Sequence, residues 1–532
     1  MAVGSAKLAA EIKSTRDQLE QLESIVGGDG APGLPEGWVE LKLERISKII
    51  SGNAFKSKDF VTEGSPVVKI SNVQAGYYIE KNQEFLPPSA LQENEGFSVN
   101  PLDILIALTR PITNDRLKIC RYPKNGDVAL LNQRVAKIDI NKGCSSQYFN
   151  HLFQSKLFKD QVESNLTETL QPNLSPKTLA LLETPLPPLA EQTVIAQTLD
   201  TLLAQVDNIK TRLDAIPKIL KTFRKSVLAA AVSGKLTEEW RGDNEKTDNF
   251  DYKKACKSER EELLDKKTKK LVGIEDFPEI EIPKTWVWQS LDESSLRITD
   301  GTHFSPKSTS SGDFMYITSK NVRAGYIDLT KISYVDEITH RGIYKRCDVK
   351  KGDVLYVKDG ANTGLACVNT IEEEISLLSS VGVFKVCSFV NPKYLEHYLN
   401  SPMGRKLMLG MMGGTAIPRL TLTKLAKAPF SLPPIKEQTQ IVRRVEELFA
   451  FADQIEKQVK NAQARVNNLT QSILAKAFRG ELTAQWRADN PDLISGENSA
   501  AALLAKIQAE REALKPKKKT AQKTKAKKEA AN

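Results

Sequence analysis

Apolar residues recur in alternating steps of four and three along two long stretches of this chain. The first stretch carries Ile195, Leu199, Leu202, Val206, Ile209, Leu213, Ile216, Leu220, Phe223 and Val227. The second carries Ile441, Val445, Leu448, Ala452, Ile455, Val459, Ala462, Val466, Leu469 and Ile473. This spacing keeps one stripe of side chains facing a partner helix, so both stretches are predicted to form coiled-coil helices. Pro217 interrupts the first stretch, where a kink is expected.

The segments 34–185 and 282–431 have a different pattern, in which short apolar runs alternate with turn signals. Examples are DILIALT in the first segment and GDVLYVKDG in the second. This pattern predicts β-rich domains built from short strands. The two domains open alike and share a phrase around Asn72 and Asn321, although they diverge elsewhere. Because positions that recognise sequence should differ, we expect these two asparagines to serve architecture or phosphate contact.

A repeat unites the two helical stretches. Leu186–Asn244 returns without a gap as Leu432–Asn490, and both copies close on G-x-L-T-x-x-W-R. The equal length of the copies indicates a spacer of fixed size. Pairing of the two helices with each other, in antiparallel fashion, is the most economical arrangement. The alternative is that each apolar stripe packs only against its own β-rich domain.

These patterns predict an α+β fold with a pseudo-twofold internal repeat, in which two β-rich domains are separated by two long helices that form an antiparallel coiled coil. The predicted segments are an N-terminal helical extension (1–33), the first β-rich domain (34–185), the first helical region (186–244), a charged and partly helical linker (245–281), the second β-rich domain (282–431), the second helical region (432–490) and a basic disordered tail (491–532).

The net charge of +10 is concentrated at one end of the chain. The last eighteen residues hold eight lysines and one glutamate, so they carry seven of the ten excess positive charges. The folded part is therefore only weakly basic. The tail is either a solubilising end or a non-specific electrostatic arm for phosphates, whose effect would fade with salt.

Motifs for catalysis and metal binding are missing from the sequence. The six cysteines are scattered without a C-x-x-C pair, and the four histidines lie far apart, which predicts no metal site. There is no phosphate-binding loop, no H-E-x-x-H, no dinucleotide-binding G-x-G-x-x-G and no N-P-P-[YF]. We therefore expect a chain without catalytic residues. The lack of a long apolar run or an export signal predicts a cytoplasmic protein that does not enter a membrane.

Polar and basic side chains gather in the predicted loops of both β-rich domains. The candidates for DNA contact are Lys56, Lys58, Gln74, Arg110, Asn114, Arg116, Gln133 and Arg134 in the first domain, and Thr302, His303, Lys320, Arg323, Lys358 and Asn362 in the second. Arginine and lysine can bond guanine, and asparagine and glutamine can bond adenine, in the major groove. Loops of this composition are also ordinary solvated surface.

Two divergent β-rich domains alternating with two such helical segments resemble the specificity subunit of type I restriction-modification systems. The most specific marks are Pro187-Pro188 with Glu191-Gln192, matched by Pro433-Pro434 with Glu437-Gln438. The resemblance implies two target recognition domains, each reading one half of a split double-stranded DNA target. It also implies that the coiled coil sets the unread gap between the halves.

The resemblance further implies partners that perform the chemistry. Two modification subunits would methylate adenine with S-adenosylmethionine, and restriction subunits would use ATP and Mg, so no cofactor is expected on this chain. The residues expected at the docking sites are Glu191, Gln192, Trp240, Glu437, Gln438 and Trp486. The alternatives are a stand-alone DNA-binding regulator and a coiled-coil structural adaptor.

Overall fold

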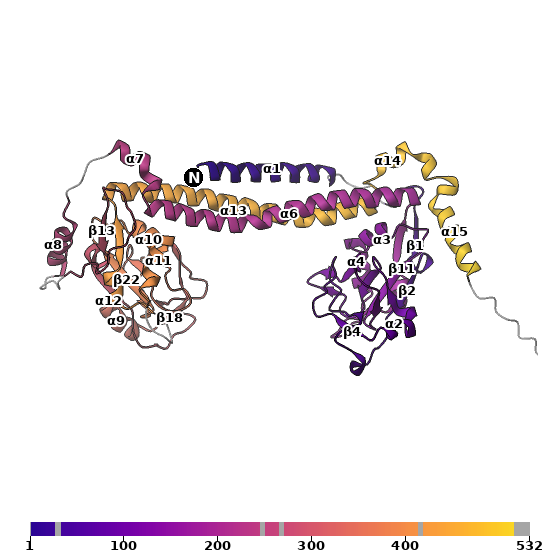
Figure 1. Ribbon diagram of the computed structural model, residues 1–532, viewed down its shortest axis with the longest axis horizontal. Helices are drawn as coiled ribbons and strands as arrows, with labels where there is room; N and C mark the ends of the chain where they lie inside the picture. Colours follow the sequence, from indigo (N-terminus) through magenta and orange to yellow (C-terminus); the bar gives the residue numbers. More distant parts are fainter. Residues whose placement is uncertain (1, 27–32, 245–249, 265–270, 413–418, 515–532) are drawn as a thin grey trace, which may run out of the picture. The chain divides into compact units, whose positions relative to one another are not determined.

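The computed structural model describes residues 2–26, 33–244, 250–264, 271–412 and 419–514 (Figure 1). They form two compact units, each combining one β-rich domain with parts of both long helices. The first-domain unit comprises residues 5–214 and 461–532, and the second-domain unit comprises residues 215–460 with residues 1–4. The α+β fold with an internal repeat, predicted from the sequence, is confirmed.

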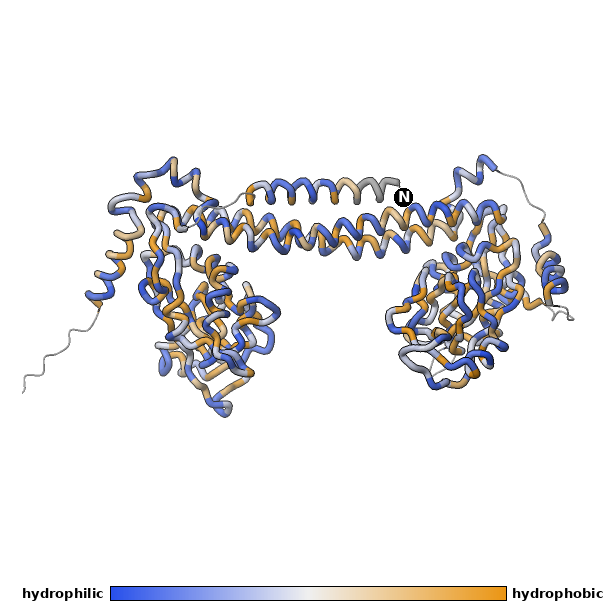
Figure 2. The backbone as a smooth tube through the Cα atoms, turned by 180° about the vertical axis from the view of Figure 1, so that it is seen from behind, coloured by the Kyte–Doolittle hydropathy of each residue, from blue (hydrophilic) through white to orange (hydrophobic). Residues whose placement is uncertain are grey.

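The two long helices are α6 (Leu189–Val232) and α13 (Ile435–Phe478), each of 44 residues. In the first-domain unit, Gln463 donates to Asp214 Oδ1 at 2.7 Å and Thr483 donates to Glu191. Going back along α6 from Asp214 to Glu191, the bonded partners advance from Gln463 on α13 to Thr483, just beyond the end of α13, so the helices pair in antiparallel fashion. Along both helices, hydrophobic and hydrophilic residues alternate (Figure 2).

The second-domain unit contains the same antiparallel pairing. Arg224 of α6 bonds Asp453 Oδ1 at 2.6 Å and Glu456 Oε2 at 2.8 Å, both on α13. The predicted seam residues of both helices are buried, except that Phe223, Leu448 and Ala462 are half-buried. The prediction that the two apolar stripes pack against each other is therefore confirmed. The alternative, in which each stripe packs only against its own β-rich domain, does not hold. Helix α6 continues through Pro217.

The first β-rich domain consists of small sheets. A pair of strands, β1 (Val39–Lys42) and β12 (Glu183–Leu186), closes the domain where α6 begins. One four-stranded sheet has the order β2 (Ser47–Ser51), β11 (Val135–Ile140), β6 (Ile104–Ala107) and β9 (Ile119–Arg121). The other has the order β4 (Glu84–Leu86), β3 (Ser65–Val68), β10 (Ala129–Leu131) and β5 (Ser98–Val99). Helices α2 (Ser89–Glu93), α3 (Ser146–Leu152), α4 (Lys156–Ser164) and α5 (Pro176–Ala180) complete it.

The second β-rich domain repeats this plan. Strands β13 (Val287–Ser290) and β23 (Pro429–Leu432) close it. Its sheets are β14 (Ser295–Asp300), β22 (Val381–Val386), β19 (Val354–Val357) and β20 (Ala366–Val368), and β18 (Ser333–Val335), β15 (Phe314–Ile317) and β21 (Ser376–Leu377). Its helices are α9 (Glu337–Arg346), α10 (Pro392–Asn400), α11 (Pro402–Gly410) and α12 (Leu422–Lys427). The repeat therefore extends through the domains whose sequences have diverged.

The shared asparagines are architectural. Asn72 accepts a hydrogen bond from Lys69 N at 2.8 Å and donates one to Ile79 O at 2.8 Å. Asn321 accepts from Thr318 N at 3.0 Å and donates to Asp328 O at 3.1 Å. Both side chains are buried and hold a tight hairpin shut.

Residues that follow the second helical region fold onto the first domain, so the prediction of a disordered tail beginning at residue 491 is wrong. Helix α15 (Ala500–Ala513) buries Ala500 and Ile507, and Arg511 donates to Ser47 O at 2.6 Å and to Glu44 O. The lysine-rich residues 515–532 lie outside the described part of the chain. A disordered assignment missed α15 because the nearby lysines dominated the composition.

Helix α8 (Tyr252–Leu264), in the predicted linker, is the counterpart of α15. Its Arg260 donates to Ser295 O and Asp292 O, both at 2.6 Å. Ser295 begins β14 as Ser47 begins β2, so the two arginines make equivalent contacts. The phrase E-R-E-x-L, at residues 259–263 and 510–514, was the available signal for this second repeat.

The N-terminal extension forms the predicted helix, α1 (Ala2–Val26), and packs within the first-domain unit. Leu19 and Leu22 are buried, and Arg212 of α6 donates to Gln18 Oε1 at 2.9 Å. Arg465 of α13 forms an ion pair with Glu23 and lowers the pKa of that carboxyl. The segment α1 is thus a third helix beside the pair. Among the described helices, none has the length and apolar character needed to cross a bilayer.

One buried histidine should make the second-domain unit sensitive to acid. His397 on α10 is 5% exposed, its Nε2 has no hydrogen-bond partner among the described residues, and burial, assisted by Lys393, lowers its pKa to about 4. The unfolded chain binds a proton near pH 6.5 whereas the folded chain does not. Stability is therefore full above about pH 6.5 and is lost as pH falls toward 4, by up to about 3 kcal/mol.

Replacing His397 with phenylalanine should flatten that pH dependence in urea unfolding measured between pH 4 and 7. His151 is the matched control, because it occupies the equivalent place in the first domain but bonds Asp200 Oδ1 at 2.7 Å, which opposes the effect of burial on its pKa. His151→Phe should change the pH dependence less. An unchanged slope for His397→Phe would contradict the assignment.

Candidate nucleic-acid interface

Strand pairing in the first domain brings three loops to one edge of its sheet. The antiparallel pairs of β11 with β2 and β6 place the end of β2, the start of β11 and the end of β6 side by side. Gly52 N bonds Val135 O at 3.1 Å, and Leu108 N bonds Arg134 O at 2.9 Å. The loops 52–58, 108–118 and 132–134 therefore meet. We call this surface the loop edge.

The second domain has an equivalent loop edge. The pairs of β22 with β14 and β19 bring together the loops 301–309, 358–365 and 378–380. Thr302 N bonds Leu377 O at 2.8 Å, and Lys358 N bonds Ser380 O at 3.0 Å. Gly52 and Gly301 take equivalent places, and a Cβ atom on either would lie within about 2.2 Å of a neighbouring carbonyl oxygen. Only glycine allows the loops to close in this way.

Most of the predicted DNA-contact residues gather at these edges. Those in the edge loops are Lys56, Lys58, Arg110, Asn114, Arg116, Gln133 and Arg134 in the first domain, and Thr302, His303, Lys358 and Asn362 in the second. Lys320 lies beside the second edge, because Asn362 bonds the adjacent Ser319 O at 2.9 Å. Gln74 and Arg323 lie in hairpins held on β9 and β20, through Gly76 N to Ile119 O and Gly325 N to Ala366 O, both at 2.9 Å.

The candidates differ in whether they face solvent. The exposed side chains are Lys56, Lys58, Arg110, Asn114, Arg116, Gln133, Arg134, His303 and Lys320. Gln74, Arg323 and Asn362 are half-buried; Gln74 and Arg323 each bond their own hairpin, and Asn362 bonds Ser319 O of the neighbouring segment. Thr302 and Lys358 are buried, at 3% and 7% exposure. The expectation that these two contact DNA directly needs correction, since both support the loops from beneath.

The first loop edge carries backbone conformations that L-residues seldom adopt. Arg110 has φ 45°, where its counterpart Gly360 has φ 91°. Beyond it, β7 (Ile112–Thr113) and β8 (Arg116–Leu117) form a hairpin whose tip, Asn114 and Asp115, has φ 51° and 58°. Asn and Asp tolerate the positive φ of this two-residue turn. The positive φ of Arg110, by contrast, costs about 1 kcal/mol. Strain at an exposed loop indicates a functional constraint.

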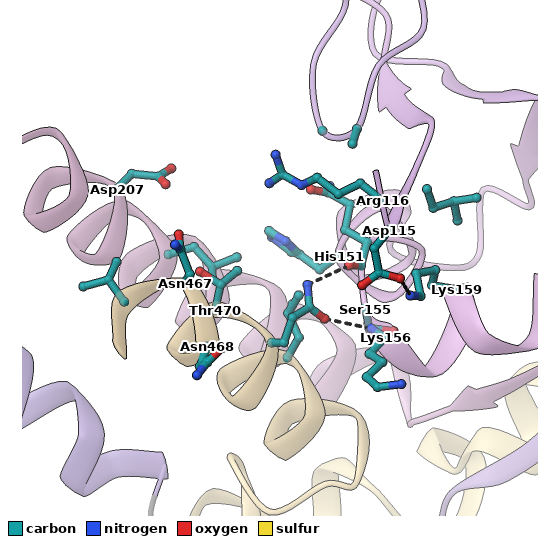
Figure 3. Close-up of a pocket in the computed structure, with 18 of the residues that line it drawn as sticks. Asp115, Arg116, His151, Ser155, Lys156, Lys159, Asp207, Asn467, Asn468 and Thr470 are labelled. Atoms are coloured by element: carbon teal, nitrogen blue, oxygen red, sulfur yellow. Dashed lines mark hydrogen bonds and ion pairs between the residues drawn. The ribbon is translucent and has the colours of Figure 1, made fainter. Parts of the chain in front are cut away.

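The same hairpin borders a groove of about 980 Å³ in the first-domain unit. Figure 3 shows Asp115, Arg116 and His151 on one side, and Asp207, Asn467, Asn468 and Thr470 from the paired helices on the other. Lys159 pairs with Asp115 and lowers the pKa of its carboxyl. The lining carries four basic side chains (Arg116, Lys156, Lys159 and Lys210) and four acidic ones (Asp115, Asp160, Glu163 and Asp207). The groove is therefore polar, but its basic and acidic side chains balance, so it is not a strong binding site for the phosphate backbone.

The predicted docking residues Glu191 and Glu437 belong to the interior. Glu191 is fully buried; it accepts hydrogen bonds from Trp38 Nε1 at 2.8 Å and Thr483 Oγ1 at 2.7 Å, and it pairs with Arg487. The first-domain clamp consists of Glu191, Trp38, Thr483 and Arg487. It joins the domain, the start of α6 and the segment after α13.

The second-domain clamp has the same geometry. Glu437 accepts hydrogen bonds from Trp286 Nε1 at 2.9 Å, Thr237 Oγ1 at 2.7 Å and Arg241 Nη1 at 2.6 Å. Gln192 and Gln438 are also buried and bond the backbone of their own unit. The expectation that these glutamates and glutamines contact a partner directly therefore needs correction, because their burial leaves them no free surface. Trp240 and Trp486 are half-buried.

The second loop edge includes charged residues that sequence reasoning missed. Arg346, the last residue of α9, bonds Asp300 Oδ1 at 2.9 Å. Asp300 ends β14 and is 2% exposed. Arg346 was missed because it lies in a helix, 43 residues from His303, and only the folded chain brings the two together.

The sequence and the fold of this chain are similar to those of known proteins. A family model described as type I restriction modification DNA specificity domain matches residues 35–218 and 298–463. The chain is 37% identical to the EcoBI specificity subunit of Escherichia coli, over 91% of this chain and 94% of that protein. It is 35% identical to the EcoKI specificity subunit of Escherichia coli strain K12, over 90% and 97%. The HsdS subunit from Thermoanaerobacter tengcongensis shares the fold, with a TM-score of 0.51 and 18% identity over 85% of this chain and 99% of that one.

Proposed function

The chain belongs to the family of type I restriction-modification specificity subunits, and on that premise we propose that each β-rich domain recognises one half of a bipartite double-stranded DNA target. The role of the chain is to supply DNA sequence specificity to the type I restriction-modification complex. Family membership favours this role over a stand-alone regulator or a coiled-coil adaptor.

One observation carries the proposal: the two domains share their scaffold and differ at the loop edge. The glycine beside the sheet, the asparagine hairpin and the clamp recur in both domains. The hairpin of β7 and β8 and the arginine–aspartate cluster occur in one domain each. Constant support with variable loops is what two readers of different sequences require.

The second part of the proposal is that the paired helices set the unread gap between the two half-sites. Each helix has 44 residues, which at 1.5 Å per residue is about 66 Å. The support is the gapless register of the two copies, since an insertion in one helix alone would misalign the shared seam. Length is therefore fixed by both copies together.

The chemistry is proposed to reside on partners, with two modification subunits docking on the two equivalent helical regions and restriction subunits joining them. Half-buried Trp240 and Trp486 occupy matching positions after the helices and are proposed to anchor the modification subunits. S-adenosylmethionine, ATP and Mg are assigned to those partners. Sedimentation of the purified complex should give two modification subunits per chain, and a one-to-one complex would contradict this stoichiometry.

Mapping of methylated bases in the genome of the host that carries this chain should test the function. The expected result is a split motif with two half-sites and a constant gap. Exchanging residues 282–431 for the same domain of a relative should change one half-site and leave the other and the gap unchanged. A contiguous motif, or a half-site that stays the same after the domain exchange, would contradict the proposal.

A further inference from the structure

The duplication provides an internal standard for polar contacts. Contacts that maintain the architecture occur twice, as in the two clamps and in the paired contacts of Arg260 and Arg511. A polar network that occurs in one domain only, and lies at the loop edge, has no such counterpart. The charged cluster around Asp300 is of this kind.

The inner side of the cluster is a buried carboxylate held between two cations. Asp300 Oδ2 lies 3.4 Å from Lys358 Nζ, and Oδ1 accepts a hydrogen bond from Arg346 Nη2 at 2.9 Å. Arg346 Nε also donates to Gly301 O at 3.2 Å. Two fixed acceptors therefore orient the guanidinium plane, which removes much of the side-chain freedom that binding would otherwise have to restrict.

The outer side of the cluster faces solvent. The side chains of Arg346 and His303 are 50% and 62% exposed. His303 Nε2 lies 2.9 Å from Arg346 Nη2 and 3.2 Å from Asp300 Oδ1, so the ring stands against both members of the pair. Arg346 Nη1 has no partner in the part of the chain that the structure describes. The exposed surface of the cluster thus offers hydrogen-bond donors.

The first domain cannot build this cluster. Strand pairing places Ser51 at the position of Asp300, since Ser51 pairs with Ala136 as Asp300 pairs with Gly382. The equivalent of Lys358 is Leu108. Counting back from Asn100 and Lys350, whose amides bond Asp103 and Asp353, Gly96 takes the position of Arg346. Both copies fold on the same scaffold, so the cluster is not required by it.

We propose that Arg346, positioned by the buried Asp300 and flanked by His303, recognises a guanine in the half-site contacted by the second domain. The inference rests on the proposed function of that domain as a reader of one half-site. In the major groove only guanine presents two adjacent acceptors, N7 and O6, and a surface of donors fits that edge. Adenine and cytosine each present a donor there, which Arg346 cannot accept.

The test is methylation mapping with the full-length chain carrying Arg346→Ala, expressed with its own partner subunits in its host. One position of one half-site should lose its preference for guanine by about 10- to 100-fold, with the other half-site and the gap unchanged. The matched control is Arg341→Ala. Arg341 lies on the same helix, is 57% exposed and pairs with Glu374 at 2.8 Å, so the motif should stay as in the parent.

Two further variants keep the test decisive if Arg346→Ala yields no folded complex. Arg346→Lys retains the charge but not the planar fork, and Asp300→Asn retains the shape but not the charge that orients Arg346. Both should relax the same position. Thermal unfolding of Arg346→Lys should match that of the parent, because the Arg346 side chain is half exposed, whereas Asp300→Asn should lower the melting temperature, because Lys358 is buried beside it.

Three outcomes would overturn the inference: an unchanged motif, relaxation at a position that was not guanine, or a uniform loss of methylation at an unchanged motif, which would indicate a phosphate contact. Failure of the proposed function is a separate result. In that case the parent chain itself would give no bipartite motif.

Discussion

Replacing Glu191 with alanine should destabilise the first-domain unit by about 3–5 kcal/mol, because it leaves the half-buried Arg487 without its carboxylate and the buried Trp38 Nε1 without an acceptor. The segment after α13 should detach from the domain as a consequence. Hydrogen exchange followed by mass spectrometry would detect this as lost protection over residues 480–514 and in β1.

Two controls localise that effect. Glu437→Ala should produce the same loss in the second-domain unit, over residues 234–243, and leave residues 480–514 protected. Glu447→Ala removes an exposed pair with Arg443 on α13 and should cost less than about 1 kcal/mol. A loss of protection spread evenly over both units would contradict the assignment of one clamp to each unit.

Inserting one heptad into both long helices should lengthen the gap between the half-sites by about three base pairs. Seven residues add about 10.5 Å of helix, and B-DNA rises about 3.4 Å per base pair. The insertions belong after Asp214 and after Ala462, because Asp214 pairs with Gln463 and the seam then stays in register. Selection of methylated DNA from a random pool would report the new gap, with both half-sites unchanged.

The single insertions are the controls for this experiment. A heptad added to α6 alone shifts every apolar residue beyond it against α13, so the complex should lose methylation. A gap that stays constant in an active double-insertion variant would show that the helices do not set the spacing.

The elements that the sequence predicts best are those governed by local periodicity. The four-three spacing from Ile195 to Val227 identifies α6 because each seam residue must be buried on one face, and that condition is written in the order of residues. The division of the chain into β-rich domains and helices rests on the same kind of pattern. These expectations hold in the structure.

The contacts that join distant segments could not be predicted in the same way. Glu191 stands out in the sequence because its copy Glu437 recurs, but repetition alone does not distinguish a buried clamp from an exposed docking site. Arg346 has no distinctive neighbours and acquires its partners only when α9 lies beside the end of β14. Tertiary structure, which periodicity does not encode, decides both cases.

The order of synthesis gives the two units different fates. Nearly all of the second-domain unit is one continuous stretch, 215–460, whereas the first-domain unit is split, and its later part begins at residue 461. A ribosome that has released residue 460 has supplied one unit almost whole and left the other waiting for α15 and for Thr483 and Arg487. A premature stop near the carboxyl terminus should therefore damage the domain encoded first, and a nascent chain should expose that domain longest to chaperones and proteases.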